Sequence, residues 1–183
     1  MMPEPLEIDV SFLCRDWLAK MPDVEDLCRR SAVAAFVGAG LEFSDGAEVC
    51  IVLADDDQVR QLNRDYRNID APTNVLSFAN VDGDGSHTPH PDGSGPVLLG
   101  DVIIAFGVTA AEAEADAKTL ADHLAHLVVH GMLHVLGHDH VEPAQAETME
   151  ALERVVLAGM DINDPYDAQP LDLERRQNGS TTS

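Results

Sequence analysis

Four histidines fall within eleven residues of the chain, in the segment HGMLHVLGHDH (130–140). Two histidines four residues apart on a helix share one face, so two imidazole nitrogens can bind the same metal ion. His126, His130 and His134 have this spacing and offer two such pairs. All three cannot bind one ion, because a rise of about 1.5 Å per residue separates the outer two by roughly 12 Å. The spacing therefore predicts a metal centre that uses two of these histidines.

A glycine after the last apolar residue of this helix favours one pair. Gly137 can adopt the left-handed conformation that ends a helix, and the chain beyond it can return toward His130 and His134. His140 has more reach for that return than His138. We therefore expect His130, His134 and His140 to bind one metal ion and to leave a fourth position for water, as in catalytic zinc sites. The other histidines of this stretch are expected at the surface or around the ligands: His123, His126 and His138.

The same histidine spacing occurs in the metzincin proteases, whose pattern is H-E-x-x-H-x-x-G-x-x-H. Their glutamate takes a proton from the metal-bound water, and Gly131 occupies that position in this chain. The missing base argues against peptide hydrolysis by that route. The pattern predicts a metal ion with a different chemical partner.

The elements that position these histidines follow from the periodicity of the sequence. Alternating or β-branched apolar residues predict four strands, at 5–12, 46–54, 73–80 and 97–106. A helical period predicts five helices, at 24–38, 55–68, 109–118, 119–136 and 143–159. Strands early in the chain and helices late indicate an α+β fold with a mixed four-stranded sheet covered by about five helices. The metal site would lie on the fourth helix and the turn after it.

Apolar positions in the first two helices predict which faces are buried. They are Val24, Leu27, Ala34 and Val37 in the first helix, and Val59, Leu62 and Tyr66 in the second. Thr119 is expected to cap the histidine helix together with Asp122, three residues later. Gly100 is expected to mark a bulge or a close backbone approach in its strand. The loop 81–95 is rich in glycine, aspartate, serine and proline, so we expect its two histidines to be solvated.

The length and composition indicate a soluble globular protein with one domain. We expect that domain to span residues 1–168 and a disordered polar tail to span 169–183. No apolar run reaches the roughly 18 residues that cross a bilayer, and the first residues lack the pattern of a secretory leader. A cytoplasmic protein without membrane contact is therefore expected. Three widely spaced cysteines indicate buried thiols rather than disulfides.

The charge of the chain argues against unaided binding to nucleic acid. With 33 acidic and 11 basic residues, the formal net charge is −22. An RNA-binding surface would need a local basic patch, and Arg60, Arg64 and Arg67 would form one on a single helix face. The simpler interpretation is a solvated helix face with ion pairs such as Arg60 with Asp56.

Three blocks of the sequence resemble the YbeY family, bacterial metal-dependent endoribonucleases that act in ribosomal RNA maturation. HGMLHVLGHDH (130–140) is similar to the family signature H-G-x-L-H-L-x-G-[YFH]-D-H. LNRDYRNIDAPTNVLSF (62–78) and LGDVIIA (99–105) are similar to two further family blocks. In order and spacing the resemblance covers most of the chain from about residue 50 to 166.

The resemblance implies that His130, His134 and His140 bind one zinc ion (Zn2+) per chain and that Arg67 faces this ion across a cleft. Arg67 and His134 would then be catalytic, because a guanidinium can hold two non-bridging phosphate oxygens while the metal polarises the phosphate or activates water. The residues assigned to substrate binding are Arg60, Arg64, Arg67 and Ser77. The sequence leaves open the general base and the roles of Asn74 and His138.

The expected function is that of a metal-dependent, single-strand-specific endoribonuclease in ribosomal RNA maturation. The resemblance implies processing of the 16S rRNA 3′ end and ribosome quality control, with the small ribosomal subunit or an assembly factor as partner. The acidic surface favours such a partner, because a chain this negative should bind free RNA weakly on its own. Two alternatives stay open. One is a metallohydrolase of another substrate, such as a peptide; the other is a non-catalytic assembly factor with a structural zinc closed by a fourth protein ligand.

Overall fold

The computed structural model describes residues 6–41, 43, 46–80, 95–137 and 143–165. Several predictions concern residues outside the described part. They are the disordered polar tail, the solvated histidines of the loop 81–95, and the positions of His138 and His140 after the predicted helix 119–136. The account that follows is confined to the described residues.

Four strands form one mixed sheet, as predicted. They are β1 (Leu6–Phe12), β2 (Ala47–Ala54), β3 (Val75–Ala79) and β4 (Val97–Ala105). The order across the sheet is β1-β2-β4-β3. The first three strands in this order run parallel, and β3 pairs with β4 in the antiparallel direction at one edge. This edge strand turns out to border the site.

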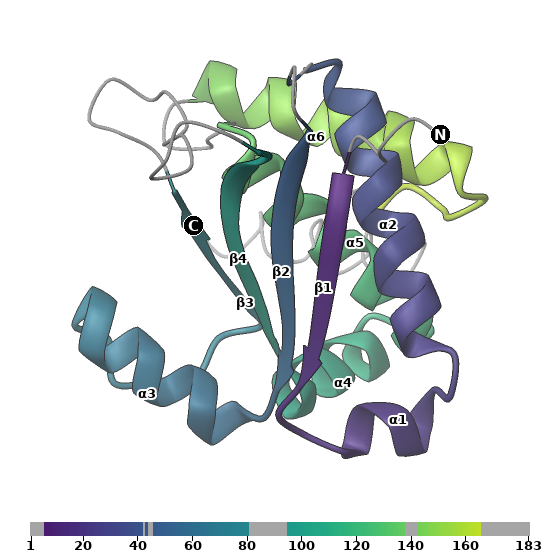
Figure 1. Ribbon diagram of the computed structural model, residues 1–183. Coiled ribbons are helices and arrows are strands. Elements are labelled where there is room, and N and C mark those ends of the chain that lie inside the picture. The colour runs from purple at the N-terminus through teal and green to yellow at the C-terminus, as the bar shows by residue number, and fades with distance from the viewer. Residues whose placement is uncertain (1–5, 42, 44–45, 81–94, 138–142, 166–183) are drawn as a thin grey trace, which may run out of the picture.

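Helices cover the two faces of the sheet unequally. On one side, α5 (Leu120–Val135) contacts β3 and β4, and α2 (Val24–Ala39) and α6 (Pro143–Gly159) pack against α5. On the other side, α3 (Asp56–Arg67) contacts β3 and β4 and stands apart from those three helices (Figure 1). Two neighbouring residues of β4 face these two sides of the sheet. Val102 packs in the large core, and Ile103 packs with Val59 of α3.

Two short helices complete the described fold. Helix α4 (Phe106–Ala115) begins three residues before the expected start at Thr109. Helix α1 (Asp16–Lys20) was not predicted, so the described residues form six helices where about five were expected. Its Trp17 is fully buried and donates a hydrogen bond to the carbonyl oxygen of Ala54 at 3.1 Å.

None of the helices in the described segments combines the length and apolar composition that crossing a membrane requires.

Two residues predicted to face inward are exposed. Val37 is 69% exposed, because it lies about 200° around α2 from the buried Ala35. Tyr66 is 71% exposed, although its spacing from the buried Val59 fits the inner face of α3. The Tyr66 ring contacts Phe78 of β3, which is the edge strand of the sheet. Position at the sheet edge therefore overrides the helical period at Tyr66.

The predicted turn residues act as expected at two points. The Thr119 side chain accepts a hydrogen bond from the backbone N–H of Asp122 at 3.0 Å, which is one half of the predicted capping box, and so caps α5. At the other end of this helix, Gly137 has φ 106°, which favours glycine. Gly100 has φ 141°, and a Cβ atom there would lie 2.1 Å from the carbonyl oxygen of Phe78. The predicted close approach at Gly100 is confirmed, and the register between β2 and β4 shifts beside it.

Candidate metal centre

His130 and His134 lie on successive turns of α5 and line the same pocket. Their ring centroids are 4.8 Å apart, as the four-residue spacing predicted. The pocket has a volume of about 340 Å³ and is bordered by the last turn of α3, the segment after it, and β3. Its lining residues are Asn63, Arg67, Ile69, Thr73, Asn74, Val75, Leu76, Ser77, His130 and His134. His140 lies outside the described residues, so a third histidine ligand stays a prediction.

Arg67 reaches this pocket from the C-terminal end of α3. The helix ends at Asn68, which has φ 60° and turns the chain toward β3. Nη2 of Arg67 donates a hydrogen bond to the carbonyl oxygen of Ser77 at 3.0 Å, and its guanidinium carbon lies 5.5 Å from the centre of the Phe78 ring. These two contacts fix the guanidinium at the edge of the sheet. The structure thus brings Arg67 and Ser77 into one pocket with His130 and His134.

Arg60 and Arg64, also predicted to bind substrate, do not line the pocket. Nε and Nη2 of Arg60 contact the two carboxylate oxygens of Asp70 at 2.8 and 3.2 Å, and this guanidinium lowers the pKa of Asp70. Arg64 lies 3.5 Å from a carboxylate oxygen of Asp65. The predicted pair of Arg60 with Asp56 is wrong: Asp56 instead accepts a hydrogen bond from the backbone N–H of Val108 at 3.0 Å.

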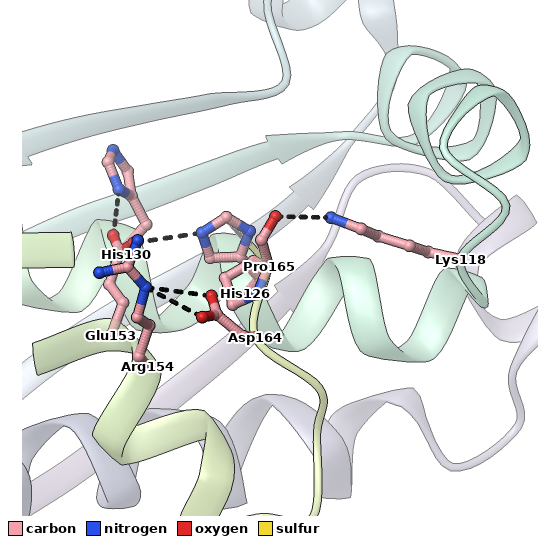
Figure 2. Close-up of polar contacts among 7 residues, drawn as sticks. All are labelled: Lys118, His126, His130, Glu153, Arg154, Asp164 and Pro165. Atoms are coloured by element: carbon pink, nitrogen blue, oxygen red, sulfur yellow. Dashed lines mark hydrogen bonds and ion pairs between the residues drawn. The ribbon is translucent and has the colours of Figure 1, made fainter. Parts of the chain in front are cut away.

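A buried glutamate that the sequence analysis missed contacts the metal helix. Glu153 of α6 has no exposed surface, and its Oε1 lies 2.5 Å from Nδ1 of His130. Its Oε2 lies 3.3 Å from Nε2 of His126, so one carboxylate accepts from two imidazoles (Figure 2). The sequence carried a signal, since Glu153 shares a helical stripe with the buried apolar residues Met149 and Val156. A carboxylate within an apolar stripe needs a buried partner.

His126, His130 and Glu153 also form a possible metal site, because their ligand atoms lie within 4.8 Å of one another. The distances between these atoms show whether Glu153 is placed as a metal ligand or as a hydrogen-bond acceptor. Two ligand atoms of one tetrahedral zinc ion are about 3.3 Å apart, given metal–ligand distances of roughly 2.0 to 2.1 Å. The 2.5 Å between Glu153 and His130 is the length of a short charge-assisted hydrogen bond. Glu153 is therefore a hydrogen-bond acceptor of His130 in the described arrangement, whereas its 3.3 Å distance to Nε2 of His126 also fits two ligands of one ion.

A second carboxylate holds another part of the pocket wall. Oε1 of Glu112 accepts a hydrogen bond from the Asn74 side-chain amide at 3.0 Å and lies 2.9 Å from Nε2 of His123. Oδ1 of Asn74 accepts from the backbone N–H of Val75 at 2.6 Å. Burial lowers the pKa of His123, which favours its neutral form. The Asn74 amide is thus fixed at both ends on the border of the pocket.

Contacts beyond α6 hold the chain segment that follows this helix. The Nε atom of Arg154 lies 3.1 Å from Asp164, and Nζ of Lys118 donates to the carbonyl oxygen of Pro165 at 3.2 Å (Figure 2). Lys118 lies just before α5, so the segment after α6 is tied to both helices. These contacts support the packing that brings Glu153 against α5.

The position of the metzincin glutamate is sterically closed. A Cβ atom at Gly131 would lie 2.5 Å from Cγ1 of Val102 and 3.2 Å from Oγ of Ser77. Gly131 is buried where α5 packs against the sheet. A glutamate side chain at this position would have to enter that contact, so the missing base reflects the packing of α5 on β4.

Known proteins are similar to this chain over most of its length. Residues 20–161 match the family model described as Endoribonuclease YbeY. The Endoribonuclease YbeY of Paramagnetospirillum magneticum is 52% identical over 169 residues, covering 92% of this chain and all of that protein. The protein of the same name from Azorhizobium caulinodans is 47% identical over 161 residues, covering 88% of this chain and 96% of that protein.

A solved structure supports the fold. The solution structure of TM1509 from Thermotoga maritima aligns with a TM-score of 0.50 and 20% sequence identity. The alignment covers 89% of this chain and 97% of the other. At this level of identity, the likeness concerns the fold alone.

Proposed function

Since the chain belongs to the YbeY endoribonuclease family, we propose that it uses a bound metal ion to hydrolyse phosphodiester bonds in single-stranded RNA. The observation that carries the proposal is a single pocket in which the Arg67 guanidinium and the His130 and His134 imidazoles lie together. Phosphodiester hydrolysis places extra negative charge on the non-bridging oxygens. A fixed guanidinium beside a metal site is suited to hold that charge.

The donor set fits a zinc ion held by His130, His134 and His140. An ionised carboxylate accepts hydrogen bonds, so the contact with Glu153 places the His130 proton on Nδ1 and leaves Nε2 for the metal. Carboxylates commonly orient zinc-binding histidines in this way. A zinc ion bound there supplies a Lewis acid beside the phosphate. His134 reaches the same pocket from the next turn of α5.

Arg67 binds and orients the phosphate in this proposal. Its contacts with the Ser77 carbonyl and the Phe78 ring hold the guanidinium in place before substrate arrives. Because a guanidinium has five N–H donors, the hydrogen bond to Ser77 uses one of them, and two others can bind two phosphate oxygens. Arg67 therefore contributes charge stabilisation that needs little rearrangement when the oxygens become more negative.

The size of the pocket and the charge of the chain support the proposed substrate. A volume of about 340 Å³ suits one nucleotide of an unpaired strand better than a duplex. The net charge of −22 weakens binding to free RNA, so we propose that the small ribosomal subunit or an assembly factor presents the strand in the cytoplasm. Processing of the 16S rRNA 3′ end and a role in ribosome quality control are the finer form of this proposal.

The alternative of a peptidase has less support. Gly131 leaves no room for the metzincin glutamate. The Ser77 carbonyl on the edge strand β3 accepts from Arg67, so it is engaged where a peptide would pair with the edge. The alternative of a structural zinc would need a fourth protein ligand in the pocket.

The proposal is tested by measuring metal content and cleavage of a single-stranded RNA together. We expect Arg67→Ala to keep its metal and to lose roughly 100- to 1,000-fold in cleavage rate, as when one charge-stabilising donor is removed. His134→Ala should lose the metal and the activity. Arg30→Ala is the matched control, because Arg30 is an exposed arginine paired with Asp26 on α2.

Three results would contradict this proposal. Cleavage by Arg67→Ala at the wild-type rate would remove the assigned role of the guanidinium. Metal-loaded wild type that cuts no RNA would favour the structural zinc. Hydrolysis of casein at a rate insensitive to Arg67→Ala would favour the peptidase.

A further inference from the structure

Tyr66 places a large aromatic ring in solvent beside the proposed active site. The side chain is 71% exposed. The ring contacts Phe78 edge to face, with centroids 5.6 Å apart and an angle of 65° between the planes. This contact supports the ring from one side. Much of the rest of the ring is open to solvent and could contact a ligand, because an aromatic ring offers a large apolar face together with a polar hydroxyl group.

The chain places this ring next to the guanidinium that would hold the phosphate. Tyr66 and Arg67 are consecutive residues in the last turn of α3, and their contacts Phe78 and Ser77 are consecutive on β3. Neighbouring strand residues point to opposite faces of the sheet. Arg67 contacts both, through the Ser77 carbonyl and the Phe78 ring. The tyrosine ring and the metal pocket therefore lie on two sides of the same edge strand, joined by Arg67.

Apart from Arg67 and the metal ion, the charges of this chain do little to attract RNA. The net charge is −22, and Arg60 and Arg64 are already paired with carboxylates. Beyond Phe78, the open face of the sheet forms a pocket of about 740 Å³. Acidic residues among those that line it repel phosphates: Glu7, Asp9, Glu48 and Asp101. RNA affinity beyond the phosphate held at Arg67 therefore needs a contact that does not depend on charge.

We infer that Tyr66, supported by Phe78, stacks on one unpaired base of the RNA while Arg67 holds the neighbouring phosphate. The inference rests on the proposed endoribonuclease function. Every base has a π-face, so such a platform selects unpaired over paired RNA with little preference for sequence. The acidic pocket beyond Phe78 confines the platform to a single base. Tyr66 is thus a substrate-binding residue that gives strand selectivity.

The inference predicts a loss of affinity of defined size. Stacking of one base on an aromatic side chain corresponds to about 5- to 150-fold in Kd when the side chain is replaced by alanine. We expect Tyr66→Ala and Tyr66→Leu to bind single-stranded RNA about tenfold more weakly than wild type. The ratio should be the same at low and high salt, because the lost contact carries no charge. Tyr66→Phe should restore the affinity, since it keeps the ring.

The test uses the full chain loaded with zinc and a single-stranded RNA that carries 2-aminopurine at one position at a time around the cleavage site. Stacking on Tyr66 should quench the fluorescence at one position, and Tyr66→Ala and Tyr66→Leu should abolish this quench. An abasic nucleotide at that position should weaken binding to wild type about tenfold and leave the affinity of Tyr66→Ala unchanged. The matched control is Val37→Ala, which removes an exposed apolar side chain from α2, over the opposite edge of the sheet.

Two results would overturn the inference. Only the second of them would also contradict the endoribonuclease proposal. If wild type cleaves RNA and Tyr66→Ala binds and quenches like wild type, stacking is wrong and the endoribonuclease proposal stands. If zinc-loaded wild type neither binds nor cleaves single-stranded RNA, both fall. Thermal melting of each variant verifies folding. Tyr66→Leu separates loss of the π-face from loss of apolar volume.

Discussion

The buried carboxylate of Glu153 gives the sharpest test of how the metal is held. Replacing it with alanine removes both acceptors, the one 2.5 Å from His130 and the one 3.3 Å from His126. Loss of a carboxylate that orients a ligand histidine typically weakens metal binding about 10- to 100-fold. That range corresponds to roughly 1.4 to 2.7 kcal/mol. We expect zinc affinity to fall within it, because His130 loses the partner that fixes its proton on Nδ1.

The same change should destabilise the metal-free protein. Glu153 has no exposed surface, so Glu153→Ala leaves the N–H groups of two partly buried imidazoles without this acceptor, which costs about 1 to 3 kcal/mol. Glu153→Gln keeps the volume and one oxygen that can accept from His130. Its amide group, however, presents N–H donors to His126. We therefore expect the glutamine variant to lie between wild type and the alanine variant in both zinc affinity and stability.

Zinc affinity is measured by competition with a chromophoric chelator, and stability by urea unfolding of the metal-free protein. The matched control is Glu112→Gln, because Glu112 makes the same type of contact, with His123 at 2.9 Å on the same helix. Neither partner in that contact lines the metal pocket. Glu112→Gln should keep wild-type zinc affinity, whereas Glu153→Gln should not.

Two single variants decide whether Glu153 orients a ligand or is itself a ligand. If it orients His130, His134→Ala abolishes zinc binding and His126→Ala weakens it only slightly. If the ion is instead held by His126, His130 and Glu153, the order is reversed. Unchanged zinc affinity in a folded Glu153→Ala variant would refute both arrangements.

Three further changes test the packing around the site. Gly131→Glu restores the metzincin pattern but should destabilise the fold by at least about 3 kcal/mol in urea unfolding, since its side chain would meet Val102; a stable variant would contradict the steric argument. Gly100→Ala should lower stability by roughly 2 to 3 kcal/mol, because its Cβ would meet the carbonyl of Phe78 at a positive φ; an unchanged melting temperature would refute this. Burial lowers the pKa of His123, so the unfolded chain takes up a proton below about pH 6.5 that the folded chain resists, and stability should fall as the pH drops through that value. His123→Gln should reduce this part of the pH dependence, and identical pH–stability curves would refute the assignment.

The sequence predicted the parts of this structure that depend on local chemistry. The four strands, the mixed sheet and the long helices follow from periodicity. The spacing of His130 and His134 placed two imidazoles on one face of a helix before any tertiary contact was known. Gly137 and Thr119 were identified from the backbone requirements of helix ends. Each of these features is determined within a few residues along the chain.

The sequence did not predict the contacts that depend on distant segments. Glu153 is 23 residues away from His130, and only the packing of α6 on α5 brings them together. The helical period predicted that Tyr66 is buried, yet its ring is exposed at the edge of the sheet. The partner of Arg60 likewise came from the segment after the helix rather than from the preceding turn. In each case, the arrangement of elements overrides a sound local pattern.

The positions of Gly131 and Glu153 follow from the packing of α5 between the sheet and α6. On the sheet side, close contact with Val102 requires glycine where a metzincin carries its base. On the α6 side, Glu153 supplies a carboxylate, but this carboxylate contacts Nδ1 of His130, the nitrogen opposite to the one left for the metal. The imidazole therefore stands between Glu153 and the pocket, so the carboxylate cannot take a proton from water bound there. In the proposed arrangement, the proton acceptor of the reaction therefore comes from another group at the pocket or from the RNA, and Glu153 orients His130.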